Sequence, residues 1–122
     1  MQTMQQMRAK HALQQVDHLK KLNGADKFKS RASELPFMIH ANGLGQALAF
    51  FKSKGDKDGY GELYAIINSW LRTPGRPFAG SADCLVALTQ CDQQTYMVAQ
   101  SEAMQYMDWV KKFAGAYLEE KQ

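Results

Sequence analysis

The sequence predicts an all-α fold, a compact single-domain bundle of about six helices. Apolar residues recur at spacings of three and four in six segments, and glycine, proline or helix-capping residues separate these segments. The sequence lacks the alternating β-branched runs that indicate strands. Its 122 residues match the size of one ordinary domain. We therefore expect a single all-helical domain over residues 1–122.

The first two helices are predicted from apolar stripes that end near Asn-Gly pairs. Residues 2–22 form the first helix, and Asn23-Gly24 supplies its left-handed stop. The second opens at Asp26 and extends to Asn42-Gly43 with Pro36 inside, which either kinks the helix or splits it in two. The stripe continues in phase across the proline, so we expect one kinked helix. The stripes are Ala9, Ala12, Val16 and Leu19, then Phe28, Ala32, Leu35 and Ile39.

The central pair of helices surrounds a polar turn. Residues 44–54 form a short helix that Gly55 ends, and the sequence GDKDG leads from it into a fourth helix over 60–71. Both segments have one apolar face, which we expect to pack inward. The faces are Leu44, Ala47, Leu48 and Phe51, then Tyr60, Leu63, Tyr64, Ile67 and Leu71.

The last two helices follow a loop at residues 72–80, which contains two prolines and two glycines. Ser81 is expected to cap a brief helix that extends to Gln90. Asp92 then starts the longest helix, which reaches about Glu119, and its alanines would let partner helices approach closely. Its predicted face is Tyr96, Ala99, Ala103, Tyr106, Val110, Phe113 and Tyr117.

Several classes of protein are excluded by composition. The chain has no apolar run long enough to span a membrane, and its first residues lack the apolar core of a signal peptide. Cys84 and Cys91 are seven apart in helical sequence, which places their Cα atoms about 10 Å apart and too far for a disulfide. Two buried thiols in a reducing cytoplasm are therefore expected.

Motifs for metal binding, nucleotide binding and catalysis are absent or incomplete. His11 and His18 are too far apart on a helix to share one ion without a third element, and the acids of residues 56–59 lack the flanking ligands of a calcium loop. The glycines of residues 42–45 follow a helix rather than a strand, so they fit a helix cap followed by close packing. No nucleophile motif occurs. We expect neither enzymatic activity nor a metal or cofactor.

Positive charge is concentrated in the first half of the chain. The net charge is only +3, but residues 1–60 hold ten basic and five acidic side chains, whereas residues 61–122 hold five and seven. Eight basic residues cluster near predicted helix ends. They form either a solvated rim of lysines, which composition alone favours, or a track for a nucleic-acid backbone. They are Lys20, Lys21, Lys27, Lys29, Arg31, Lys52, Lys54 and Lys57.

Methionines raise a second question about the surface. Met97, Met104 and Met107 flank the main apolar face of the last helix at helical spacing. Such extra apolar width either belongs to the core of a small bundle or packs against a partner protein. The pattern leaves these two interpretations about equal, and the three residues are candidates for a protein interface.

The central and C-terminal segments resemble the small subunit of the type III-B CRISPR RNA-silencing complex, the Cmr complex. The resemblance rests on NGLGQALAFFKSKG at 42–55, on NSWL at 68–71, and on the pairing of EA at 102–103 with WVKKFA at 109–114. It extends over nearly the whole chain. These are packing and capping residues rather than reactive groups, so the resemblance indicates a family and assigns no site.

The resemblance implies a compact all-α protein without catalytic activity that serves antiviral defence in the cytoplasm. Such subunits stack along the backbone subunits that hold the guide RNA, and they help to accommodate the target strand. The implied partners are other Cmr subunits, neighbouring copies of the same chain and the guide RNA–target RNA duplex. The resemblance raises the RNA-track interpretation of the eight basic residues above the solvated rim. The alternative is a helical adaptor that contacts only protein.

Overall fold

The computed structural model describes residues 1–21 and 27–118. Within these residues the chain forms six α-helices and one short 3-10 helix, and no strand. The all-α prediction is thus confirmed. The elements are α1 (Met4–Lys21), α2 (Phe28–Asn42), α3 (Leu44–Ser53), η1 (Lys57–Gly59), α4 (Tyr60–Leu71), α5 (Cys84–Gln90) and α6 (Gln93–Tyr117).

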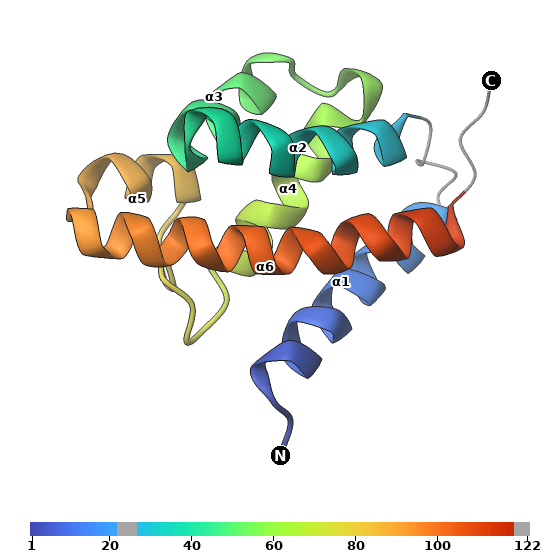
Figure 1. Cartoon of the computed structure of the whole chain (residues 1–122), viewed down its shortest axis with the longest axis horizontal. Helices are drawn as coiled ribbons and strands as arrows, with labels where there is room; N and C mark the ends of the chain where they lie inside the picture. Colours follow the sequence, from blue (N-terminus) through green and yellow to red (C-terminus); the bar gives the residue numbers. More distant parts are fainter. Residues whose placement is uncertain (22–26, 119–122) are drawn as a thin grey trace.

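The longest helix, α6, organises the bundle. It runs the length of the molecule, and α2 lies beside it in the opposite direction (Figure 1). Helix α1 also packs extensively on α6, and α4 contacts α1, α2, α3 and α6. The short helix α5 sits at the end of the molecule where α6 begins and packs on α3 and α4. The core therefore lies between α6 and the other helices.

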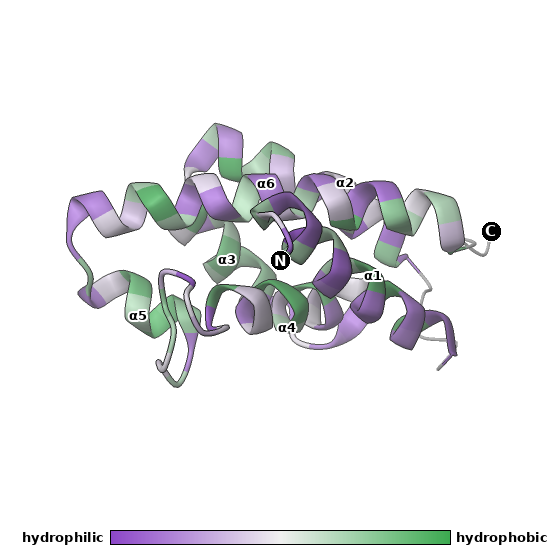
Figure 2. Ribbon diagram, turned by 90° about the horizontal axis from the view of Figure 1, so that it is seen from below, coloured by the Kyte–Doolittle hydropathy of each residue, from purple (hydrophilic) through white to green (hydrophobic). Residues whose placement is uncertain are grey.

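The predicted apolar stripes form most of this core. Those of α2 and α3 are almost completely buried. Helix α4 is hydrophobic over most of its length, and it buries Ile66 and Trp70 in addition to its predicted stripe, whereas α1 is mostly hydrophilic (Figure 2). In α1, Ala9 is only half-buried and Arg8 takes the inward position above Ala12. The buried stripe of α1 therefore begins at Arg8 and not at Ala9, the residue that the sequence predicted.

The connection between α2 and α3 confirms two sequence predictions. Helix α2 is one continuous helix with Pro36 inside it, so the split alternative is wrong, while the kink expected at Pro36 stays a prediction. Gly43, at a φ of 87°, ends α2 and precedes α3 directly, as expected of a helix cap. A Cβ atom on Gly45 would lie 3.1 Å from Leu88 Cδ2 and 3.3 Å from the Tyr96 hydroxyl oxygen, which confirms close packing there.

The start of α3 is also closed to a phosphate group. The backbone N–H of Leu44 donates to Gln100 Oε1 at 2.9 Å, and that of Gly45 donates to the Tyr96 hydroxyl at 2.9 Å. Because side chains of α6 occupy these donors, the helix terminus has little capacity left for an anion. The glycines of this segment therefore serve packing.

Several predicted helix ends need correction. Asp83, not Ser81, caps α5: its carboxylate accepts from the backbone N–H of Leu85 and Val86, while the Ser81 hydroxyl donates to the carbonyl oxygen of Phe78. The Asp92 cap of α6 is confirmed, since its carboxylate accepts from Thr95 N at 2.8 Å. Helix α6 ends at Tyr117, and the predicted end at Glu119, the stop at Asn23-Gly24 and the start at Asp26 lie outside the described residues.

The buried face of α6 differs partly from the predicted one. Ala99, Ala103, Tyr106 and Val110 are completely buried, and the alanines admit the neighbouring helices closely, as expected. Toward the ends of the helix the predicted face turns outward, because 3.6 residues per turn do not match its spacing over six turns. Tyr96 and Phe113 are half-buried, Tyr117 is 49% exposed, and Met107 and Ala114 complete the core instead.

Both cysteines are free thiols, as the sequence predicts. Cys84 is buried next to the Tyr64 hydroxyl, and burial raises the pKa of its thiol to about 11. Cys91 is only half-buried, so the prediction of two buried thiols holds for Cys84 alone. Cys84 thus behaves as a small apolar core residue.

Candidate functional site

Six of the eight candidate basic residues lie where the start of α2, the end of α3 and η1 meet. The contact is close, because a Cβ atom on Gly59 of η1 would lie 3.0 Å from Phe28 Cα and 3.2 Å from Arg31 Cγ. Packing thereby brings residues from distant parts of the sequence to one surface, as expected. We call it the junction surface; it carries Lys27, Lys29, Arg31, Lys52, Lys54 and Lys57.

Three of these six cations already have partners. The Arg31 guanidinium donates to Glu34 Oε2 at 2.8 Å and to the Tyr60 hydroxyl, and it lies over the Tyr60 ring. Lys52 Nζ is 4.7 Å from the ring centroid of Tyr64, and Lys54 Nζ is 4.9 Å from that of Phe50. Among the described residues, Lys27, Lys29 and Lys57 have no ion-pair or aromatic partner. These three are the cations most available to an external anion.

Carboxylates are interleaved with the cations of the junction surface. Asp56 and Asp58 flank Lys57 in the chain, and Glu34 and Glu62 come from the adjoining turns of α2 and α4. The Asp56 carboxylate approaches within 2.5 Å of the position a Gly61 Cβ would take, which fixes it against the start of α4. The local excess of positive charge is therefore small.

The remaining two candidates, Lys20 and Lys21, lie at the end of α1. Lys21 forms an exposed ion pair with Asp17 at 3.1 Å, which contributes little to stability. Lys20 borders a groove of about 390 Å³, which Leu13 of α1 and Tyr117 of α6 also line. These lysines lie toward the end of the molecule where α6 ends and α2 begins (Figure 1), which is also the end that carries Lys29 in the first turn of α2.

The three candidate interface methionines have different surroundings. Met97 is 54% exposed near the start of α6, and Val86 and Val98 are similarly exposed. Met104 is half-buried and lines a groove of about 340 Å³ beside Pro36 of α2. Met107 is completely buried in the core, because the face of α6 turns inward at this position, so its assignment to a protein interface is wrong.

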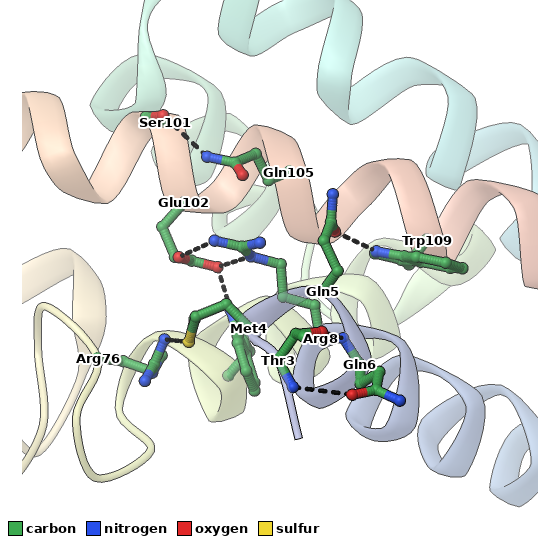
Figure 3. Close-up of polar contacts among 11 residues, drawn as sticks. Thr3, Met4, Gln5, Gln6, Arg8, Arg76, Ser101, Glu102, Gln105 and Trp109 are labelled. Carbon is green, nitrogen blue, oxygen red and sulfur yellow. Dashed lines mark hydrogen bonds and ion pairs between the residues drawn. The ribbon is translucent and has the colours of Figure 1, made fainter. Parts of the chain in front are cut away.

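A buried polar network joins α1, α4 and α6, and the sequence analysis missed it. Arg8 Nε and Nη2 donate to Glu102 at 2.7 and 3.0 Å, which makes a two-bonded ion pair between α1 and α6 (Figure 3). The Trp70 indole N–H donates to the same carboxylate at 2.9 Å. Both charged residues are more than nine-tenths buried. Charged side chains in phase with the apolar stripes of two helices were the signal in the sequence.

The surroundings of Glu102 keep it ionised. Burial by itself raises the pKa of this carboxyl, but the hydrogen bonds from Arg8 and Trp70 and the charges of Arg8 and Arg76 outweigh burial, so the pKa lies below its ordinary value. The negative charge of Glu102 is therefore compensated by the positive charge of Arg8.

An aromatic group lies beside this pair. The Trp70 and Tyr106 rings stack with centroids 5.1 Å apart, and His11 packs on both rings. His11 Nδ1 is 2.5 Å from the Tyr106 hydroxyl and its Nε2 is 3.2 Å from Ser69 Oγ. Burial lowers the pKa of His11, so the neutral imidazole is favoured. The side chain of His11 is thus held by stacking and hydrogen bonds within the bundle.

The described residues were compared with two further kinds of site, a metal centre and a membrane span, and they form neither. No group of three or more histidine, cysteine or carboxylate side chains is placed to hold a metal ion. None of the helices in this part of the chain combines the length and apolar character needed to cross a membrane.

The fold and these surfaces define a small all-α protein with basic charge at the ends of its helices. The family model described as "CRISPR-associated protein (Cas_Cmr5)" matches residues 4–117. The chain therefore belongs to the Cmr5 family of CRISPR-associated proteins.

Two relatives agree with this assignment. The chain is 28% identical over 120 residues to the "CRISPR system Cmr subunit Cmr5" of Thermus thermophilus, with 98% of this chain and 100% of the relative covered. It is also similar to the crystal structure of a CRISPR-associated Cmr5 family protein from Thermus thermophilus, with a TM-score of 0.82, 28% identity, and the same coverage of the two chains. The all-α expectation drawn from the resemblance is thus confirmed.

Proposed function

We propose that this chain is a non-catalytic structural subunit of a type III-B Cmr ribonucleoprotein. In this role it is a single domain over residues 1–122 that stacks along the filament of guide RNA and backbone subunits in the cytoplasm and serves antiviral defence. Its partners are other Cmr subunits, neighbouring copies of itself and the guide RNA–target RNA duplex. The observation that carries the proposal is the family match over residues 4–117, together with the complete coverage of the Thermus relative.

The junction surface is the proposed point of contact with RNA. Lys27, Lys29 and Lys57 are cations without partners among the described residues, and lysine ammonium groups suit phosphate contact more than base recognition. Sequence choice in guide-directed complexes comes from base pairing, so a sequence-independent surface is sufficient. Lys20 can extend the same contact, whereas the pairing of Lys21 and Arg31 supports only a bordering role for them.

A helical adaptor without direct RNA contact is the second candidate. Two observations favour it: carboxylates are interleaved with the cations of the junction surface, and Val86, Met97 and Val98 expose more than half of their side chains on α5 and α6. Exposed apolar side chains that gather on neighbouring elements are typical of protein contacts. In this role Met97 and Met104 bind a neighbouring subunit.

The proposal is tested by tagging the chain in its native cells and identifying what copurifies. A Cmr subunit brings down several larger subunits and short guide RNAs. A chain that purifies as a lone monomer, with neither RNA nor other subunits, contradicts the proposal.

Charge reversal separates the two candidate functions. Replacing Lys27, Lys29 and Lys57 by Glu weakens target-RNA binding by the assembled complex if the junction surface contacts RNA, and leaves it unchanged if the chain is an adaptor. Met97→Glu tests the protein contact, with Gln94→Glu, which adds the same charge at an exposed position one turn away, as its matched control. Loss of incorporation specific to Met97→Glu supports the interface, whereas equal incorporation of both variants contradicts it.

A further inference from the structure

A second basic site lies in a cleft between α1, the end of α4 and the loop over residues 72–80. The cleft has a volume of about 280 Å³, and its polar and aromatic walls are Lys10, His11, Gln14, Trp70, Thr73 and Arg76. Among the described residues, none of those that line the cleft carries a carboxylate. The cleft thus differs from the junction surface, where carboxylates stand among the cations.

The two cations of the cleft are not neutralised within the described residues. Lys10 is exposed and forms no ion pair there. Arg76 forms no ion pair there either; its guanidinium lies 5.3 Å from the centroid of the Trp70 ring and its Nη1 donates to Met4 Sδ at 2.9 Å (Figure 3). The Trp70 ring and Met4 hold Arg76 in place without cancelling its charge.

The nearby carboxylate, Glu102, is already committed. Two hydrogen bonds from Arg8 and one from Trp70 satisfy it, and it is 8% exposed beneath the cleft residue Trp70. Because Arg8 compensates Glu102, the charges of Lys10 and Arg76 remain as a local excess of two. This excess faces an open cleft and can attract an anion.

The shape of the cleft favours a phosphate group over a base. Its volume lies below the range of pockets that enclose drug-sized ligands. Trp70 is 3% exposed and stacks on Tyr106, so its ring is not available to a nucleobase, and its indole N–H is occupied by Glu102. A phosphodiester group can enter beside Lys10 and Arg76 while its bases stay outside.

We propose that this cleft binds a backbone phosphate of an RNA strand through Lys10 and Arg76. The cleft and η1 lie toward opposite edges of the molecule, since the start of α1 and the loop over 72–80 are at the lower edge of Figure 1 and η1 is at the upper edge. The site is therefore a second phosphate contact, separate from the junction surface. The choice of RNA as the polyanion rests on the proposed function. The cleft and its positive charge are observed in the structure and do not depend on that function.

The test uses the full chain, with one arm for a strand and one for a free anion. Backbone and arginine side-chain N–H signals are followed by NMR during titration with single-stranded oligouridylate and, separately, with inorganic phosphate at low salt. The strand is expected to shift Lys10 and the Arg76 side chain at concentrations where inorganic phosphate does not. Shifts in the cleft with inorganic phosphate but not with the strand overturn the proposal, as does a silent cleft in both arms.

Lys10→Gln measures how much the contact contributes. At about 50 mM salt, removing one phosphate contact to a single strand is expected to weaken binding by up to about eightfold. Lys111→Gln removes the same charge from an exposed position of α6 that lies outside the cleft and has no ion pair among the described residues, and it should change affinity less than about twofold. Equal effects of the two variants overturn the proposal, and thermal melting verifies that both remain folded.

Failure of this inference is distinguishable from failure of the proposed function. If the strand shifts Lys27, Lys29 and Lys57 but leaves the cleft silent, the cleft proposal fails and the RNA contact at the junction surface stands. If the chain does not copurify with guide RNA, the proposed function fails whatever the cleft binds.

Discussion

The junction surface and the cleft both gather cations from separate helices, but they differ in where their carboxylates lie. At the junction surface Glu34, Asp56, Asp58 and Glu62 stand among the lysines. At the cleft Glu102 is buried beneath the surface and paired with Arg8. Lys10 and Arg76 therefore face outward with no carboxylate among the described residues of the cleft, whereas the unpaired cations of the junction surface share that surface with four carboxylates.

The difference teaches that the number of basic residues in a segment is a poor measure of its attraction for an anion. What matters is the charge that remains after internal pairing. A carboxylate that is buried against an arginine neutralises that arginine and leaves the neighbouring cations unopposed. An exposed carboxylate in a turn lowers the potential of every lysine around it.

The largest expected effect comes from removing the buried carboxylate. Glu102→Gln leaves the Arg8 guanidinium buried without a compensating charge, and this is expected to lower the free energy of unfolding by about 4 kcal/mol. Chemical denaturation of the purified chain measures the change. A loss below about 1 kcal/mol would contradict the account of Glu102 as the compensating charge of a buried Arg8.

A paired substitution provides the control for Glu102→Gln. Arg8→Met combined with Glu102→Leu removes both charges and fills the space with apolar atoms, so most of the stability should return. The Trp70 indole N–H loses its acceptor in this variant, and the recovery is therefore incomplete. If the double variant is less stable than Glu102→Gln alone, the loss in Glu102→Gln does not come from a buried, uncompensated Arg8.

The backbone of the junction surface is tested by Gly59→Ala. Gly59 has a φ of 84°, and an added Cβ would meet Phe28 Cα at 3.0 Å, so the variant is expected to lose about 2 to 3 kcal/mol of stability. Gly55→Ala is the matched control, because Gly55 also has a positive φ but nothing lies within 4 Å of its Cβ position. It should lose only about 1 kcal/mol. Equal losses in both variants would show that contact with α2 does not matter.

A smaller, pH-dependent effect is expected at the cleft. Burial lowers the pKa of His11 from its ordinary 6.5, so below pH 6.5 the unfolded chain takes up a proton more readily than the folded chain does. The contribution of His11 is fully present above pH 6.5 and is lost as the pH falls. The melting temperature should decline between pH 6.5 and 4.5, above the range in which Glu102, with its lowered pKa, is protonated.

Single histidine variants identify the source of this decline. His11→Gln should flatten the dependence of melting temperature on pH in this interval, whereas His40→Gln, at an exposed position, should leave it as it is in the natural chain. A decline that persists in His11→Gln assigns the effect to other groups and contradicts this explanation.

The sequence predicted the helices well because local signals determine them. The stripes of α2 and α3, the Gly43 turn and the Asp92 cap all follow from neighbours within a few residues, and the structure confirms them. Ser81 and Asp83 are both good capping residues two positions apart, so local sequence does not distinguish them, and tertiary packing selects Asp83. Met107 was misplaced because the helical face rotates gradually along α6.

The surfaces were harder to predict because they depend on contacts between distant residues. Arg8 and Glu102 are 94 residues apart, and their pairing becomes evident only when α1 packs on α6. The cleft combines Lys10 with Arg76 for the same reason, and neither was a sequence candidate. Conversely, the sequence predicts the clustering of basic residues at helix ends, but the carboxylates of α2 and α4 come to lie among them only when these helices pack together.

The central claim is that the junction-surface lysines that have no partner among the described residues contact RNA in the assembled complex. The most direct measurement is the dependence of target-RNA affinity on salt concentration for complexes that contain the natural chain, the Lys27→Gln/Lys57→Gln variant or the Lys111→Gln/Lys112→Gln control. We predict that the junction variant flattens the slope of log affinity against log salt by about 1.4 per copy, and that the control leaves it nearly unchanged. Slopes that are identical in all three complexes would contradict the claim.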